Sequence, residues 1–513
     1  MKQVVITLWF IIILVLAACT AEPTTPPMEV PEPIELTIGL SLDVESMDPF
    51  FVNQAAGWSV VHALFDHLIE RDFEGDIVAG LAESWSIVDE TTLEFVLRQG
   101  VSFHNGEAFN AYSVKFSVER MLAGNGVPNQ SKFTTIDAVE VVGEYTVRLL
   151  LNKPDGTLLD SLSSCLAMLP PQYFAKVGAE GFARAPVGTG PFLFVEWMPD
   201  DHVTLAANQD YWDGSYKGMP LVNVGTFRPI PEAATRVAEL QTGGVDIIQD
   251  VPVDQMDDLE SAGLTVAPYE AFQLQYIFFA ADDERLPTHS VEVRQALNYA
   301  VDVEAIIEHL LSGLGSRIAS PIGPGYLGYN PEVEPYSYNP DLAKQMLAEA
   351  GYPDGFEATL DTTTAGHTDV IDAVAGYLSE VGVEVTIQEY ELGQFNQNWM
   401  ERSQSMLWAA RWGNTPDPQS IGPFASCAGW IARYCNAEVT ALLDGATNTL
   451  DQDERAGLYS QASQMMHDDP LAIYLTTFTQ IYGLGPGVEN FQPSPLLALI
   501  VSGVSLSDRS TPC

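Results

Sequence analysis

The residues best suited by type to bind a small molecule fall in one stretch, MLWAARWGNTPDP, at residues 406–418. Its apolar half predicts a strand over residues 406–412, and its polar half predicts a loop. Trp408 and Trp412 are four positions apart, so they share one face of that strand. Arg411 carries a planar guanidinium that can bind a carboxylate through two parallel hydrogen bonds. The alternative, which the sequence leaves open, is that Arg411 pairs with one of the chain's own carboxylates.

Sequence motifs of the common hydrolases do not occur in the chain. There is no Gly-x-Ser-x-Gly elbow, no His-Glu-x-x-His helix and no Cys-x-x-Cys pair, which argues against a serine hydrolase, a metalloprotease and a thiolate zinc site. His62 and His67 are five positions apart and so do not share a helix face as i,i+4 ligands would. They are predicted to be ordinary surface histidines or core histidines with satisfied hydrogen bonds. We predict no enzyme activity, no metal and no cofactor.

A secreted glycoside hydrolase is the remote enzymatic alternative. It needs two carboxylates about 5–10 Å apart across a cleft. Because the chain has 69 acidic residues, some pair will always satisfy that spacing, and composition carries no weight.

Length and charge limit the architecture and the partners. A chain of 513 residues is too long for one core, so two or three lobes are expected. The formal net charge of −47 repels a phosphate backbone and excludes nucleic acid as a partner. The acidic surface is either a solvated surface that suits the medium or a means of attracting cationic solutes.

Local patterns predict the elements that position the candidate residues. An apolar stripe indicates a helix over residues 59–68, and a glycine-rich turn precedes a hairpin with strands at 192–197 and 202–207. The first hairpin strand is apolar on both sides and is expected to be buried on both faces. Asp302 is predicted to cap a helix. The strand–helix–strand order of residues 357–389 argues for a mixed α/β lobe.

The N-terminal sequence predicts a targeting segment. Lys2 precedes an apolar run at residues 4–15, and Leu16-Ala-Ala-Cys19 resembles a bacterial lipobox, in which Cys19 would be lipidated after removal of residues 1–18. Residues 20–33 are rich in Pro, Thr and Glu and are expected to form a flexible tether. A simple signal peptide or an anchor helix is the alternative.

Several longer motifs resemble one family. They include LAESWSIVDETTLEFVLRQGVSFHNGEAFNAYSVKFSVERM, APVGTGPFLFVEWMPDDHVTLAANQDYW, LQTGGVDI, VRQALNYAVDVEAII and YNPDLAKQMLAEAGY, in order along the chain. Together they resemble the extracytoplasmic solute-binding proteins of ABC importers, family 5, which take up oligopeptides, dipeptides and nickel. The resemblance implies a two-lobed, periplasmic-binding-protein-like α/β fold of class II type, with an extra subdomain in the first lobe and a hinge between lobes.

The resemblance also implies a domain plan. Lobe I would span residues 34–268, with the accessory subdomain at 58–185, and lobe II would span residues 269–475. Residues 476–513 would return to lobe I.

The same resemblance implies a site between the lobes. It places Asn53, Gln54 and Ala55 on a loop facing the solute, and it places Ala410, Arg411 and Trp412 where the strand pairs with the solute backbone. Peptide-binding members carry an aspartate shortly afterwards for the solute's ammonium. Ungapped alignment puts Asn414 there, and Asp417 takes the role only if the loop is shifted. The family also includes oligosaccharide binders, for which the aromatic faces of Trp58, Trp408, Trp412 and Trp430 would suit sugar rings.

The cysteines fit an exported protein. Cys427 and Cys435 are eight residues apart, and the resemblance supports a disulfide between them, with two free buried thiols as the alternative. Cys165 is expected to be a packed thiol, and the state of Cys513 cannot be read.

The resemblance thus implies a monomeric, lipid-anchored binding protein outside the cytoplasmic membrane of a bacterium. It would deliver an oligopeptide or dipeptide to an ABC permease, with an oligosaccharide as the alternative solute.

Overall fold

In the part of the chain that the structure describes, ten strands form one mixed sheet in the order β14-β13-β15-β12-β16-β11-β1-β10-β9-β8. The structure is a computed structural model and describes residues 33–124, 126–363, 368–413 and 415–507. These strands are β1 (Glu35–Leu40), β8 (Phe192–Met198), β9 (His202–Ala207), β10 (Val224–Pro229), β11 (Ile247–Ile248), β12 (Thr265–Phe279), β13 (Phe356–Thr363), β14 (Val383–Tyr390), β15 (Leu407–Trp412) and β16 (Ala472–Leu484). The fold is therefore mixed α/β, as predicted.

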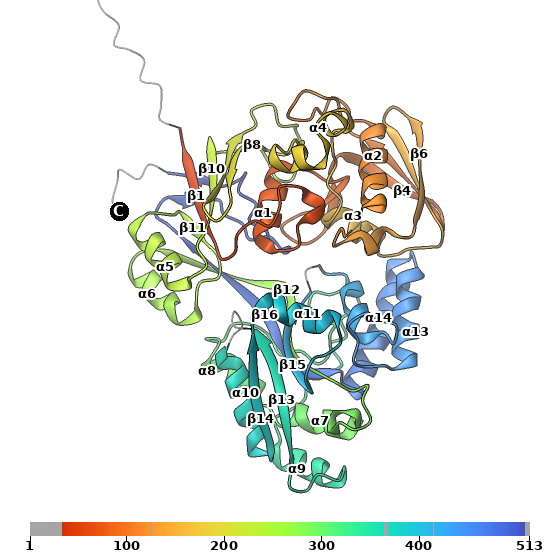
Figure 1. Cartoon of the computed structure of the whole chain (residues 1–513), viewed down its shortest axis with the longest axis vertical. Helices are drawn as coiled ribbons and strands as arrows, with labels where there is room; N and C mark the ends of the chain where they lie inside the picture. The colour runs from red at the N-terminus through yellow and green to blue at the C-terminus, as the bar shows by residue number, and fades with distance from the viewer. Residues whose placement is uncertain (1–32, 125, 364–367, 414, 508–513) are drawn as a thin grey trace, which may run out of the picture. The chain divides into compact units, whose positions relative to one another are not determined.

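The two longest strands, β12 and β16, pair antiparallel along almost their whole length (Figure 1). Their register shifts between Ala271 and Leu274, and again between Leu274 and Tyr276. Before the shift, β12 packs into the cores around β1 and β11, whereas from Leu274 onward it packs into two other cores. One sheet thus runs continuously through four separate hydrophobic clusters.

The largest cluster holds the first part of the chain. A four-stranded sheet in the order β4-β5-β7-β6 is covered by α2, which a capping box at Asn110 begins. The elements here are α1 (Ala55–Leu64), β2 (Ile69–Arg71), β3 (Ile77–Ala79), β4 (Ala82–Asp89), β5 (Thr92–Leu97), α2 (Ala111–Ala123), β6 (Ile136–Gly143), β7 (Thr146–Leu151), α3 (Leu158–Ser164) and α4 (Pro171–Arg184). Two helices, α5 (Ala233–Thr242) and α6 (Met256–Ser261), pack near β11.

Helices cover both faces of the sheet around β13 and β15. One face carries α7 (Val291–Tyr299), α8 (Val303–His309), α9 (Pro340–Glu349) and α10 (Thr368–Glu380). The other carries α11 (Leu392–Met400), α12 (Gly422–Ala425), α13 (Ala437–Asn448) and α14 (Gln452–Asp468), followed along the chain by a two-stranded ladder of β17 (Val488–Glu489) and β18 (Ser505–Leu506). Asp302 caps α8 by accepting a hydrogen bond from the Ala305 N–H at 3.0 Å, as predicted.

Two sequence predictions about the first part of the chain are wrong in detail. The hairpin forms as expected, but β8 is the last strand of the sheet, so Val195 is 53% exposed and the strand is not buried on both faces. Helix α1 ends at Leu64 instead of residue 68, because Phe65 is extended and the Gly190 N–H takes the Leu64 carbonyl at 3.0 Å. A Cβ at Gly188 would lie 2.0 Å from that carbonyl oxygen. Only a glycine therefore lets this turn approach the end of α1 closely enough for the contact at which the helix ends.

Across the described ranges, none of the helices has the length and apolar character needed to traverse a bilayer. The Sγ atoms of Cys427 and Cys435 are bonded to each other, and Cys165 is a buried free thiol. Cys19 and Cys513 lie outside the described residues.

Candidate ligand-binding site

Strand β15 places its aromatic side chains in the core rather than at a surface. Trp408 is 2% exposed and stacks on Phe278, with ring centroids 5.5 Å apart. Trp412 packs edge-on against Phe424 at 4.4 Å, and its indole N–H donates to the Ser420 carbonyl at 2.7 Å. The two tryptophans share a face, as predicted, but that face is a packing face. The interpretation of Trp408 as a sugar platform is therefore wrong.

Arg411 lies on the opposite face of β15 and remains exposed. Its guanidinium rests over the Phe478 ring of β16, 4.3 Å from the centroid. Protein around the side chain desolvates it and lowers its pKa, while the Asp250 carboxylate acts in the opposite direction. Arg411 forms no ion pair within the part of the chain that the structure describes. Pairing with a protein carboxylate, the alternative that the sequence left open, is not observed.

Asp417 is already neutralised by the protein. Its Oδ2 accepts a hydrogen bond from Arg455 Nη2 at 2.6 Å, and both side chains are buried. Its Oδ1 accepts from the Gln419 N–H at 3.0 Å and caps a short 3-10 helix, Pro418–Ile421. Desolvation raises the pKa of Asp417, and Arg455 opposes that shift. Asp417 is therefore a structural ion-pair partner and not a free anchor for an ammonium group.

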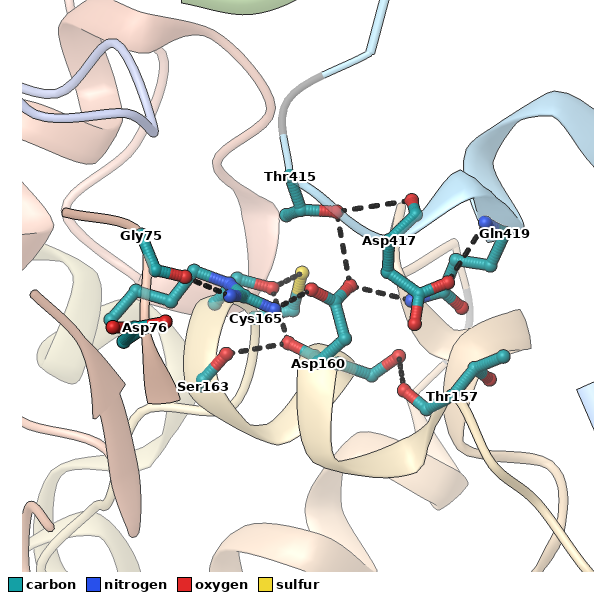
Figure 2. Close-up of polar contacts among 12 residues, drawn as sticks. Gly75, Asp76, Thr157, Asp160, Ser163, Cys165, Thr415, Asp417 and Gln419 are labelled. Carbon is teal, nitrogen blue, oxygen red and sulfur yellow. Dashed lines mark hydrogen bonds and ion pairs between the residues drawn. The ribbon is translucent and has the colours of Figure 1, made fainter. Parts of the chain in front are cut away.

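A buried carboxylate that the sequence reasoning missed stands at the centre of the site (Figure 2). Asp160, on α3, accepts a hydrogen bond from Arg71 and another from Thr415 Oγ1 at 3.2 Å. It also accepts from the side-chain amide of Gln419. These bonds join α3, which packs in the first cluster, to the loop that follows β15. No local pattern marks Asp160, because its partners are 89 and more residues away.

The other end of α3 meets the start of α1. Asn53 and Trp58 line a cavity of about 40 Å³ together with Ser164 and Cys165 of α3. That volume holds about two or three water molecules. Helix α3 thus contacts both groups of candidate residues: its carboxylate holds the loop after β15, and its C-terminus faces Asn53 and Trp58.

The segment before α1 carries a second carboxylate that the sequence reasoning did not single out. Glu45 Oε1 accepts from the Asn53 N–H at 3.3 Å. Desolvation raises the pKa of Glu45, against the hydrogen bonds from the backbone. Gln54 and Ala55 begin the helix beside it.

The remaining candidate residues are spread more widely. Ala410 pairs with Tyr276 in the sheet, and Trp430 is 52% exposed within the disulfide loop. Asn414 lies outside the described residues. The structure therefore gathers part of the predicted set. Trp408 packs in the core, Asp417 is held in an ion pair, and Asp160 and Thr415 are contacts that the sequence reasoning did not single out.

The comparison with known families decides the identity of the chain. The sequence model for the bacterial extracellular solute-binding proteins, family 5, matches residues 76–431. The chain belongs to this family. This family 5 protein is a solute-binding protein of the ABC-importer class, and its place is outside the cytoplasm. It is a binding protein and not an enzyme.

Relatives and solved structures agree with that assignment. Heme-binding protein A of Haemophilus influenzae is 32% identical over 491 residues, which cover 87% of each chain. The glutathione-binding protein GsiB of Pectobacterium atrosepticum is 29% identical over 485 residues, or 90% of this chain and 92% of that one. The periplasmic binding protein DppA of Helicobacter pylori, solved with the peptide STSA, superposes with a TM-score of 0.81 at 25% identity and covers 93% and 99% of the two chains. These structural neighbours have two lobes, as predicted for this chain.

Proposed function

We propose that this family 5 protein captures a small peptide-like solute through a carboxylate of that solute, and that Arg411 is the group that binds it. The observation that carries the proposal is an exposed guanidinium at the end of β15 with no protein carboxylate paired to it within the described residues. An arginine in that state offers its planar fork to a carboxylate. Partial desolvation by the surrounding protein strengthens such a bond.

The ligands named for the relatives support this chemistry. Heme, glutathione and a tetrapeptide are named for the three proteins compared above. Their shapes differ, but each carries at least one carboxylate. A binding site that binds the carboxylate and makes few specific contacts with the rest of the solute could accept ligands of such different shapes.

The ammonium end of a peptide has no ready partner at Asp417. Because Arg455 neutralises that carboxylate, an ammonium placed there would compete for a group that is already satisfied. Glu45, in the segment before α1, is an exposed carboxylate that we propose for this role. Two of the four tryptophans expected to suit sugar rings, Trp408 and Trp412, instead pack against Phe278 and Phe424.

We place the two lobes at residues 34–268 and 269–475, with the accessory subdomain at 58–185 and the return from residue 476. The register shift of β12 near Ala271 and the change of hydrophobic cluster there support these limits. Closure is a hinge motion at β12 and β16, and the bonds from Thr415 and Gln419 to Asp160 hold the closed form. A monomer anchored through a lipid on Cys19 delivers the solute to the permease.

The test is calorimetry with the purified protein against dipeptides to pentapeptides, glutathione and the same peptides amidated at the C-terminus. Binding of the free acids together with much weaker binding of the amides is the expected result. Equal affinity for acids and amides contradicts the role of Arg411. Absence of heat from every peptide-like solute contradicts the ligand class.

A further inference from the structure

Three side chains with no role proposed so far lie together where α1 ends. His62, His67 and Glu70 are all buried, and each offers a ligand atom within 4.8 Å of the other two. The sequence reasoning set His62 and His67 aside because they are not one turn apart on a helix. That reasoning is wrong here, because α1 ends at Leu64 and the chain turns back, so the two imidazole centroids are 5.3 Å apart.

One nitrogen of each imidazole is buried without a hydrogen-bond partner in the described part of the chain. These atoms are Nδ1 of His62 and Nε2 of His67. The other nitrogen of His67, Nδ1, lies 3.2 Å from Glu70 Oε2. A carboxylate in that position fixes the ring so that the proton sits on Nδ1 and the lone pair sits on Nε2, an arrangement typical of metal-binding histidines.

The charge of the surrounding core favours a cation. Lys217 Nζ lies 2.8 Å from Asp66 and 3.2 Å from Glu70, so one buried ammonium faces two buried carboxylates. One ammonium beside two carboxylates leaves a net negative charge in a buried region, which is costly unless a further positive charge balances it.

The imidazole of His62 is buried, and its Nδ1 accepts or donates no hydrogen bond within the described part of the chain. His62 also lines the cavity of about 40 Å³ next to Trp58, which has room for about two or three water molecules as further ligands.

We propose that His62 and His67 bind a transition-metal ion that prefers imidazole ligands, with Glu70 orienting His67. Zinc, nickel and copper all suit imidazole nitrogen. With metal–nitrogen bonds of about 2.0–2.1 Å, two nitrogens on one ion lie at most about 4.2 Å apart. Each of the three side chains offers a ligand atom, and these atoms lie within 4.8 Å of one another, so the side chains must move closer together to hold one ion. The site is separate from Arg411, although His62 lines the same cavity as Asn53 and Trp58.

A protonated His67 is the competing explanation. An imidazolium paired with Glu70 would balance the charge without a metal, and the measurement must separate these two states. The readout is therefore the metal content of the protein, which does not depend on any solute.

The experiment uses the full folded protein, stripped with a chelator and then incubated separately with Zn(II), Ni(II) and Cu(I). Metal bound after desalting is counted by mass spectrometry, and affinity is measured against a chromophoric chelator. The variants are His62→Gln, which removes Nδ1, and His67→Asn, whose amide can still donate to Glu70. The matched control is His309→Gln, an exposed histidine in the last turn of α8.

The expected result is one metal ion per chain in the unchanged protein and in the His309→Gln control. Both site variants should bind that metal at least about 100-fold more weakly, because each loses a direct ligand and second-shell changes alone cost 10- to 100-fold. If a variant fails to fold, X-ray absorption at the metal edge of the unchanged protein should show imidazole scattering. Retention of none of the three metals, equal retention in the site variants, or a spectrum without imidazole would each overturn the proposal.

Discussion

Replacing Asp417 by Asn separates a structural role for this carboxylate from a role in holding the solute. The variant keeps an oxygen that accepts from the Gln419 N–H, but it leaves the buried Arg455 without its counter-charge. Breaking a buried ion pair by removing one partner costs about 3–5 kcal/mol. Arg455 still donates to the Ala446 carbonyl at 3.1 Å and to Gln452 at 3.0 Å, so we expect a loss near 3 kcal/mol.

For a folding unit of roughly 200 residues, that loss lowers Tm by about 6–12 °C. Differential scanning calorimetry without solute measures it, and solute affinity at 25 °C should change by less than about threefold. The matched control is Asp283→Asn, which breaks an ion pair of the same length, 2.6 Å, with the exposed Arg285. An exposed pair contributes little to stability, so Tm of this control should change much less than that of Asp417→Asn. If Asp417→Asn left Tm unchanged and weakened solute binding more than tenfold, the assignment of Asp417 to the core would be refuted.

Three further predictions concern Arg411, Thr415 and His62. Arg411→Gln should weaken binding of a free-acid peptide by about 10- to 100-fold, because a bond between charged groups is lost, and should leave the amidated peptide unaffected; equal losses in calorimetry would contradict the assignment. Thr415→Val removes the bond to Asp160, which we propose exists only in the closed form, so solute affinity should fall about tenfold with Tm unchanged; an unchanged Kd argues against that latch. Burial lowers the pKa of His62, so below about pH 6.5 the unfolded chain binds a proton there that the folded chain does not. In metal-free buffer, stability should therefore fall as the pH drops from 7 to 5. His62→Gln should remove up to about 1.4 kcal/mol per pH unit of that slope, and an identical slope in denaturant titrations would rule the explanation out.

Local sequence signals predicted the elements of this fold well. The hairpin of β8 and β9, the strand β15 and the cap at Asp302 all rest on neighbouring residues, and all are found. The local pattern of apolar residues did not indicate where in the sheet a strand lies. The apolar residues of β8 predicted a strand buried on both faces, yet only the sheet order reveals that β8 is an edge.

The candidate site was harder to predict for the same reason. Arg411 was singled out by its place in the strand to which the family resemblance points and by its side chain, which binds carboxylates well. The role of Asp417, by contrast, is determined by its ion pair with Arg455, a helix residue 38 positions later. The burial of Trp408 is determined by its stacking on Phe278. Asp160 carried no signal at all, since its partners come from two distant segments.

The pairing of β11 with β16 imposes an order on how the chain can fold. Ile247 pairs with Leu484, and β11 lies between β1 and β16, so one side of β11 stays open until the chain is nearly complete. Everything from β12 to α14 must be present before that edge is closed, and loops of this length make such a contact slow to form. A chain that is synthesised from its N-terminus therefore cannot complete its central sheet before β16 has been made. Until β16 has been made, the incomplete chain can still pass through a pore in extended form, and chaperones that hold extended segments can still bind it.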